Sequence, residues 1–301
     1  MAKANIQELL DNGVHFGHLT RKWNPNMAPY IYTERNGVHI IDLYKTAAKI
    51  EEASLALQKI ANSGRKILFV ATKKQAKDIV SEKAAAVNMP FITERWPGGM
   101  LTNFITIRKA VKKMTSIDRM KQDGSFDALS KREKLQINRQ REKLDKNLGS
   151  IVDMTRLPGA IFVVDVKKEH IAIAEAQKLN IPIFAMVDTN SDPRPVDFVI
   201  PSNDDASKSI EKVLSFITEG IAEGLSDRKA EKEKAKPAEK AAEKTAEKTA
   251  EEPAAKEAVK KAAKPAKAAK PAKKEVVKEV EVVKEATPVV ETTTETTVEK
   301  K

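Results

Sequence analysis

Residues 66–93, KILFVATKKQAKDIVSEKAAAVNMPFIT, contain the pattern that decides the fold. The opening run, KILFVA, is short and apolar and is rich in residues typical of buried strands, and the closing run, MPFIT, has the same character. The segment between them places apolar side chains at the three- and four-residue steps of a helix: Ala76, Ile79, Val80 and Ala84. The stretch therefore predicts a strand, a helix and a second strand.

The same order of elements returns in residues 159–188, GAIFVVDVKKEHIAIAEAQKLNIPIFAMVD. Two strand-helix-strand units in one chain favour a parallel sheet with helices on both faces. A short strand at residues 198–200 and a helix over about residues 205–223 are expected to complete this body. The predicted fold class is α/β, with a Rossmann-like parallel sheet.

A long charged segment separates the two units, over about residues 105–150. Its apolar residues recur at helical steps, the sequence QDGS predicts a turn, and Ser130 with Glu133 forms a capping box that begins a second helix. The segment therefore predicts a helical hairpin inserted into the sheet. Its apolar seam is narrow, which leaves the basic faces of both helices free.

The composition changes at Ser226. From there to the last residue the chain uses almost only Ala, Lys, Glu, Val, Thr and Pro, without Gly, aromatic residues, Leu or Ile. Such a segment lacks the apolar surface that a packed core requires, so we expect it to be disordered. The predicted organisation is a folded body over residues 1–225 and a low-complexity tail over residues 226–301.

The chain is strongly basic, with a net charge of +11 and an isoelectric point near 9.5. A basic surface favours a polyanionic partner, because Lys and Arg that neutralise phosphates release bound counterions. No apolar run is long enough to span a membrane, and the start, MAKANIQELL, lacks the apolar stretch of a signal peptide, so we expect a cytoplasmic protein. The absence of cysteine excludes disulfides, thiolate zinc sites and a cysteine nucleophile.

Residues 94–104, ERWPGGMLTNF, contain the two adjacent glycines of the chain, as a phosphate-binding loop would. They lack the GK[ST] ending of such a loop, however, and the loops that follow the two central predicted strands, TKKQ and VKKE, contain no glycine. Ordinary dinucleotide or nucleoside triphosphate binding is therefore not expected. A sharp turn between strand and helix explains the glycines equally well.

Metal binding is one hypothesis for His18, Asp188, Asp204 and Asp205, because loops at one edge of the sheet would bring them together. The alternatives are a core histidine, a turn aspartate after a strand and a capping aspartate before the last helix. No GxSxG motif accompanies the four histidines, so a hydrolase is not expected.

Several basic residues lie at positions that favour contact with a nucleic acid. The pairs Lys73-Lys74 and Lys167-Lys168 precede predicted helices, where cations are disfavoured unless an anion lies nearby. Each tryptophan also has a base beside it, as expected at a phosphate-and-base surface, although a solvated helix start and a core aromatic are the plainer alternatives.

Four blocks carry a resemblance to a known family: GVHFGHLTRKWNPNMAPYIYTERNGVHIIDLYKT, LFVATKKQA, ERWPGGMLTNF, and FVVDVKKEHIAIAEAQKLNIPIFAMVDTNSDP with the following VDFVIPSNDDASKSI. Together they resemble bacterial small ribosomal subunit protein two, over about residues 6–223. The resemblance implies a structural protein that binds 16S rRNA, with no catalysed reaction, no membrane, no small-molecule substrate and no required cofactor. It also implies that the inserted hairpin is a coiled coil, and that the partners are other small-subunit proteins, above all the large mRNA-binding ribosomal protein one.

The resemblance also implies the functional residues. Some bacterial members hold a zinc ion, and the matching positions are His18, Asp188, Asp204 and Asp205. A metal-dependent enzyme that uses this cleft for a small molecule is the rival hypothesis. The expected RNA contacts come from the loops and from the first helix of the hairpin: Arg21, Lys22, Trp23, Asn24, Lys73, Lys74, Arg95, Trp96, Gly98, Gly99, Asn103, Arg108, Lys109, Lys112 and Lys113.

Overall fold

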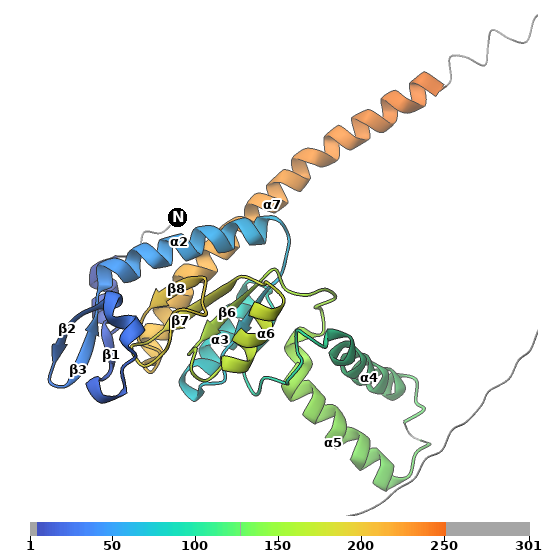
Figure 1. Cartoon of the computed structure of the whole chain (residues 1–301). Helices are drawn as coiled ribbons and strands as arrows, with labels where there is room; N and C mark the ends of the chain where they lie inside the picture. The colour runs from blue at the N-terminus through green and yellow to red at the C-terminus, as the bar shows by residue number, and fades with distance from the viewer. Residues whose placement is uncertain (1–4, 127, 251–301) are drawn as a thin grey trace, which may run out of the picture. The chain divides into compact units, whose positions relative to one another are not determined.

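A computed structural model describes residues 5–126 and 128–250 of the chain (Figure 1). The chain divides into two units, residues 1–244 and residues 245–301. Both sheets and all the candidate functional residues lie in the first unit.

A five-stranded parallel sheet in the order β5-β4-β6-β7-β8 forms the centre of the first unit. Every residue of β4, β6 and β7 is buried, as strands covered on both faces must be. The chain leaves β4 for β5 on one side and returns to β6 on the other, so the strand order reverses there. The predicted α/β fold is confirmed by five strands: β4 (Ile67–Val70), β5 (Phe91–Ile92), β6 (Ala160–Val164), β7 (Ile183–Val187) and β8 (Phe198–Pro201).

Helices cover both faces of this sheet (Figure 1). Phe69, Phe162 and Phe184 point to one face, whereas the neighbouring Leu68 and Ile161 point to the other. The second face packs against α6 (His170–Lys178) and the base of the inserted hairpin. The first face packs against four helices: α1 (Ile6–Asp11), α2 (Leu43–Asn62), α3 (Lys74–Ala86) and α7 (Ser207–Ala250).

The insertion between β5 and β6 is a pair of helices that contact each other (Figure 1). The predicted capping box is present, because Glu133 N–H donates to Ser130 Oγ and Ser130 N–H donates to the Glu133 carboxylate. Arg141 on the second helix donates to Asp118 on the first at 2.9 Å. The helical hairpin is confirmed, whereas a coiled coil stays a prediction. Its elements are α4 (Phe104–Gln122), α5 (Lys131–Leu148) and the 3-10 helix η3 (Gly149–Ile151).

A separate three-stranded antiparallel sheet precedes the parallel one, in the order β1-β3-β2. Asn36 and Gly37, at φ 53° and 73°, form the turn between β2 and β3. The strand β1 was not predicted, since the four residues FGHL are too few to show the alternation of apolar and polar residues that indicates a strand. This region comprises β1 (Phe16–Leu19), η1 (Thr20–Lys22), η2 (Pro25–Tyr30), β2 (Ile31–Arg35) and β3 (Val38–Ile41).

The last helix is longer than the sequence pattern indicated. We expected it to end near Glu223, but α7 continues to Ala250. The added segment is rich in Ala, Glu and Lys, which have high helix propensity and need no buried apolar face to extend a helix that is already nucleated. Residues 251–301 of the expected tail lie outside the described residues. Among the described helices, none is both long and apolar enough to cross a membrane.

Candidate cation site and nucleic-acid interface

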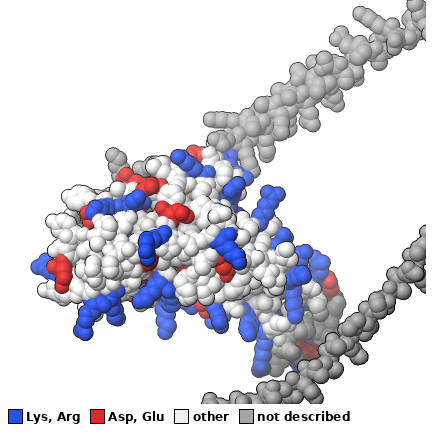
Figure 2. Space-filling model, in the orientation of Figure 1, with Lys and Arg blue, Asp and Glu red and all other residues white. Residues whose placement is uncertain are grey.

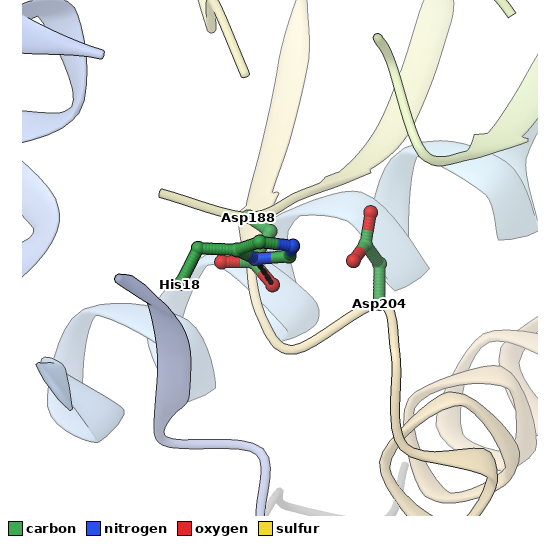
Figure 3. Close-up of side chains that lie close together, drawn as sticks. All are labelled: His18, Asp188 and Asp204. Carbon is green, nitrogen blue, oxygen red and sulfur yellow. Dashed lines mark ion pairs between the residues drawn. The ribbon is translucent and has the colours of Figure 1, made fainter. Parts of the chain in front are cut away.

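Three side chains from distant parts of the chain meet beside the carboxyl ends of β7 and β8 (Figure 3). His18 comes from β1, Asp188 follows β7, and Asp204 precedes α7. His18 Nδ1 lies 3.0 Å from Asp188 Oδ2, and one ligand atom from each residue lies within 4.8 Å of the others. The structure thus brings three of the four expected metal ligands together.

Thr189 joins β1 to the end of β7. Its hydroxyl accepts a hydrogen bond from His18 N–H at 2.8 Å and donates one to Asp188 Oδ1 at 3.1 Å, while its carbonyl accepts one from Asn24 N–H at 2.8 Å. Glycine is needed at position 17, because a Cβ there would lie 2.6 Å from Thr189 Cγ2. This close approach fixes His18 over the edge of the sheet.

Burial determines the charge state of Asp204. Its side chain is fully buried, and its Oδ2 accepts no hydrogen bond from any residue that the structure describes. Burial and the negative charges of Asp188 and Asp165 raise the pKa of Asp204 to about 7, although Lys73 opposes this shift. The hydrogen bond to Asp188 raises the pKa of His18. A cation at this site would therefore compete with a proton on His18 and with the ammonium of Lys73.

Lys73 lies inside this acidic cluster and does not face solvent. Its Nζ lies 2.8 Å from Asp204, 2.6 Å from Asp205 and 3.8 Å from Asp165, and its side chain is 12% exposed. A cation at the start of a helix such as α3 is unfavourable unless an anion lies nearby, and here the protein's own carboxylates are that anion. Lys73 is therefore not a free surface cation, and its expected contact with RNA stays a prediction. Asp205 is not a member of the group of three ligands. Its side chain is exposed, and its Oδ2 lies 3.2 Å from the other ring nitrogen of His18, Nε2.

A second carboxylate occupies the point where the strand order reverses. Thr72, just beyond β4, donates its backbone N–H to Glu169 at 2.9 Å and its hydroxyl to the same oxygen. Glu169 is 3% exposed. Nucleotide phosphates bind at this position in folds of this kind, but here the edge of the sheet is lined by acids. That charge repels a phosphate and suits a cation.

The glycine-rich loop closes on a carboxylate of the protein itself. Glu175, on α6, is 8% exposed. Burial by itself raises the pKa of Glu175, but hydrogen bonds from Trp96 and from the loop amides more than reverse that effect, so its pKa lies below the usual range. Amides that point inward at Glu175 cannot also bind an external phosphate. The donors, at 2.8 to 3.2 Å, are Trp96 Nε1, Gly99 N, Leu101 N, Thr102 N and Thr102 Oγ1.

This network places Trp96 in the core, where its side chain is 7% exposed. The expectation that Trp96 lies on an RNA-facing surface is therefore wrong. Gly99 adopts φ 80°, a conformation that favours glycine, and its N–H donates to Glu175, so it turns the chain and offers no donor to RNA. Arg95 and Gly98 are exposed on either side of the buried ring.

Near β1, Arg21 and Lys22 are exposed in η1, beside Trp23, whose side chain is 39% exposed. The Trp23 ring lies 5.1 Å from that of His39. Asn24 caps η2 by accepting a hydrogen bond from Asn26 N–H at 2.9 Å, so its oxygen serves the local fold. Three of the four expected contacts in this segment therefore present side chains to solvent.

The helix α4 presents Lys109, Lys112 and Lys113 to solvent, and Lys74 is exposed at the start of α3. Blue side chains project from the hairpin and from the lower margin of the body in Figure 2. Two other expected contacts are used within the protein: Arg108 donates to the Thr155 carbonyl at 3.0 Å, and Asn103 Oδ1 accepts a hydrogen bond from Thr106.

Sequence reasoning missed Glu169 and Glu175, the two buried carboxylates that organise these loops. A signal for Glu175 was present, because the helix that carries it reads IAIAEAQ and places one acid among the apolar residues of its buried face. A buried acid requires several donors, and the glycine-rich loop is the segment that supplies them.

Comparison with known proteins identifies the chain's relatives. The sequence profile of the family described as Ribosomal protein S2 matches residues 9–224. The small ribosomal subunit protein uS2 of Flavobacterium johnsoniae is 77% identical over 216 residues, which cover 72% of this chain and 85% of that protein. Its namesake in Flavobacterium psychrophilum is 77% identical over 217 residues, covering 72% and 82%. The uS2 protein of Parabacteroides distasonis is 67% identical over 219 residues, covering 73% and 79%.

The matched family segment spans both sheets, the hairpin and the His18 cluster, so the match covers all the candidate functional residues. The chain belongs to the Ribosomal protein S2 family, whose named relatives are proteins of the small ribosomal subunit.

Proposed function

We propose that the chain binds 16S rRNA through the exposed cations of α4 and of residues 20–24. The supporting observation is the separation of its cations into two groups. Lys73 is mostly shielded from solvent and paired with the protein's own acids, whereas Lys109, Lys112 and Lys113 are exposed on one helix and form no ion pair within the described part of the chain. Exposed, unpaired cations in a row are suited to a phosphate backbone.

The role of these contacts is positional. The sheet fixes the base of the hairpin, so the exposed lysines of α4 are held in place by the fold. Trp23, beside Arg21 and Lys22, adds a half-exposed ring that a base or sugar could contact. Lys74 and Arg95 are further exposed cations, which follow the neighbouring strands β4 and β5.

Family membership decides between a structural protein and an enzyme. The chain is a constituent of the small subunit of the cytoplasmic ribosome, and its relatives are named as ribosomal proteins and not as enzymes. The alternative of a metal-dependent enzyme acting on a small molecule is therefore wrong.

Reconstitution tests the RNA contact. Small subunits that lack this protein are mixed with the wild type or with a variant in which Lys109, Lys112 and Lys113 are replaced by Gln, and bound protein is measured by sedimentation. We expect the variant to sediment with the particles at low salt and to dissociate at a lower salt concentration than the wild type. Equal retention at every salt concentration would contradict the proposal for α4.

We also propose that the antiparallel sheet is the docking surface for the large mRNA-binding ribosomal protein one. The supporting observation is its exposed apolar residues: Phe16 is 51% exposed, Leu19 50% and Tyr32 76%. Exposed apolar side chains on one small sheet are typical of a protein-protein interface. Replacing Phe16 and Tyr32 with Ser should reduce the amount of that protein retained on reconstituted subunits, while the amount of this chain stays constant.

We propose that a zinc ion is bound by His18, Asp188 and Asp204. One imidazole and two carboxylates form a donor set that zinc accepts, and the buried Asp204 Oδ2 has no hydrogen-bond partner among the described residues. An ion there would connect β1 to the ends of β7 and β8 and would have a structural role. Asp205 is the nearest additional carboxylate.

A further inference from the structure

A groove of about 500 Å³ lies between the glycine-rich loop and α5. Its apolar lining, here called the floor, includes Pro97, Leu144 and the buried Trp96. Two amide side chains, Gln140 and Asn147, line it from α5. Its volume lies within the range of roughly 300–1,000 Å³ that is typical of pockets for small organic groups.

The loop side of the groove is held rigid from beneath. Glu175 accepts hydrogen bonds from Trp96 Nε1 and from Gly99, Leu101 and Thr102, so the segment on both sides of Gly98 is fixed to α6. A site that exists before its ligand arrives loses less conformational entropy on binding. The groove is therefore a formed site and not a gap between mobile segments.

The charges at the groove are positive and uncompensated. Arg95 and Lys143 are exposed, line the groove, and form no hydrogen bond or ion pair with another described residue. The neighbouring acid, Glu94, is paired with Lys77 at 3.3 Å and with Lys146 at 3.4 Å. The residues that line the groove include no Asp or Glu. An anionic ligand is therefore favoured over a neutral or cationic one.

An apolar floor, two amides and two free cations together match the chemistry of a nucleotide. We propose that this groove binds one unpaired nucleotide of ribosomal RNA, extruded from its helix. The base lies on Pro97 and Leu144, the amide of Asn147 meets its edge, and Arg95 and Lys143 bind the flanking phosphates, while Gln140 lines the groove beside them. An acidic peptide would satisfy the cations but would leave the apolar floor without a matching group. The proposal rests on the proposed binding of rRNA and adds a defined site to it.

Site-specific crosslinking tests the proposal in reconstituted small subunits. A photoreactive benzophenone amino acid replaces Gln140 in one full-length chain and Lys109 in another, so that one probe lies in the groove and the other on the exposed face of α4. The groove probe is also combined with one of two substitutions, Lys143→Glu or Gly98→Trp. Gly98 lines the groove, so a Trp there occupies space in it without removing a charge. The backbone can accept this side chain, because no atom lies within 4 Å of a Cβ at position 98. Lys131→Glu is the matched control: it makes the same change of charge on the same helix, three turns or so from the groove.

We expect the probe at position 140 to crosslink to a single rRNA nucleotide. Lys143→Glu and Gly98→Trp should each reduce the yield about tenfold, as expected for the loss of one charge-assisted contact or of the space for the base, and Lys131→Glu should leave it unchanged. Crosslinks to a protein, or none, at position 140 while position 109 crosslinks to RNA would overturn the groove site and leave the proposed function standing. Subunits that contain the chain but show no RNA crosslink at either position would contradict both.

Discussion

Trp96 Nε1 donates a hydrogen bond to the carboxylate of Glu175 at 3.1 Å, and both side chains are more than nine-tenths buried. The same carboxylate accepts the backbone N–H groups of Gly99, Leu101 and Thr102. A glycine-rich loop that could bind a phosphate through its amides therefore binds an internal anion. The loop is a structural joint between the sheet and the hairpin, and it leaves Arg95 at the surface.

Replacing Glu175 with Ala should destabilise the body strongly. The substitution leaves several buried donors without an acceptor, and we expect the free energy of unfolding to fall by about 3 kcal/mol. Urea unfolding followed by tryptophan fluorescence measures this change. Glu82→Ala, at an exposed site on α3, is the control and should change the free energy by no more than about 0.5 kcal/mol.

The lowered pKa of Glu175 also predicts a pH dependence. The folded state holds this carboxylate ionised to a lower pH than the unfolded state does, where its pKa is 4.5. Its contribution to stability is therefore complete above pH 4.5 and is lost as the pH falls through the folded-state pKa. Between pH 5 and pH 3, the free energy of unfolding should fall more steeply for the wild type than for Glu175→Gln. Parallel curves over this range would show that the carboxylate does not have the assigned role.

Substitutions at Arg95 and Trp96 should have different effects on stability, although the two residues are adjacent in the chain. Trp96→Phe removes the indole donor from a buried site and should cost about 1–2 kcal/mol of stability. Arg95→Ala should leave the free energy of unfolding within about 0.5 kcal/mol of the wild type and should weaken incorporation into small subunits. Thermal unfolding and sedimentation of the two variants measure both quantities. A large loss of stability in Arg95→Ala would contradict its assignment as a surface contact.

The sequence predicted most of the fold because its pattern is local. The two strand-helix-strand units and the capping box at Ser130 all follow from residues that are close together in the chain. The end of α7 was not predicted, since an Ala-, Glu- and Lys-rich segment carries no core-forming pattern yet extends a helix readily.

The candidate sites were predicted less completely, because long-range pairing determines whether a charged or aromatic residue is free. Lys73 and Arg108 were expected at the RNA interface, but each has a partner more than 40 residues away in the chain. Trp96 was assigned to the surface because of its neighbour Arg95, whereas Glu175 on another helix draws it inward. The grouping of His18, Asp188 and Asp204 was predicted, since loops at one edge of a parallel sheet converge.

The raised pKa of Asp204 predicts that stability changes with pH in the direction opposite to that predicted for Glu175. In metal-free protein, the unfolded carboxyl ionises near 3.8, whereas the folded one stays protonated up to about pH 7. The unfolded state is therefore stabilised by ionisation between these values, and the free energy of unfolding should decline as the pH rises from 4 to 7 and level off above 7. Asp204→Asn should remove this decline. Urea titrations of the chelator-treated wild type and variant at each pH measure the difference.

Zinc binding should depend on the three clustered residues and be opposed by Lys73. Elemental analysis of protein purified without chelator should find close to one equivalent of zinc in the wild type and in the control Asp78→Asn, which alters an exposed acid on α3. Asp188→Asn should lose the metal, and Lys73→Gln should retain it more tightly because the competing ammonium is gone. Less than about one-tenth of an equivalent in the wild type would remove the metal site.

The salt dependence of binding to rRNA tests the central claim most directly. Affinity for protein-free 16S rRNA is measured over a range of salt concentrations for the full-length wild type and for the variant with Gln at positions 109, 112 and 113. A matched control carries Gln in place of the exposed Lys59, Lys178 and Lys208, which lie on α2, α6 and α7. If α4 neutralises phosphates, the slope of log affinity against log salt should decrease by roughly 2–3 in the α4 variant and stay at the wild-type value in the control. Equal slopes for the wild type and the α4 variant would contradict the claim that this helix holds rRNA.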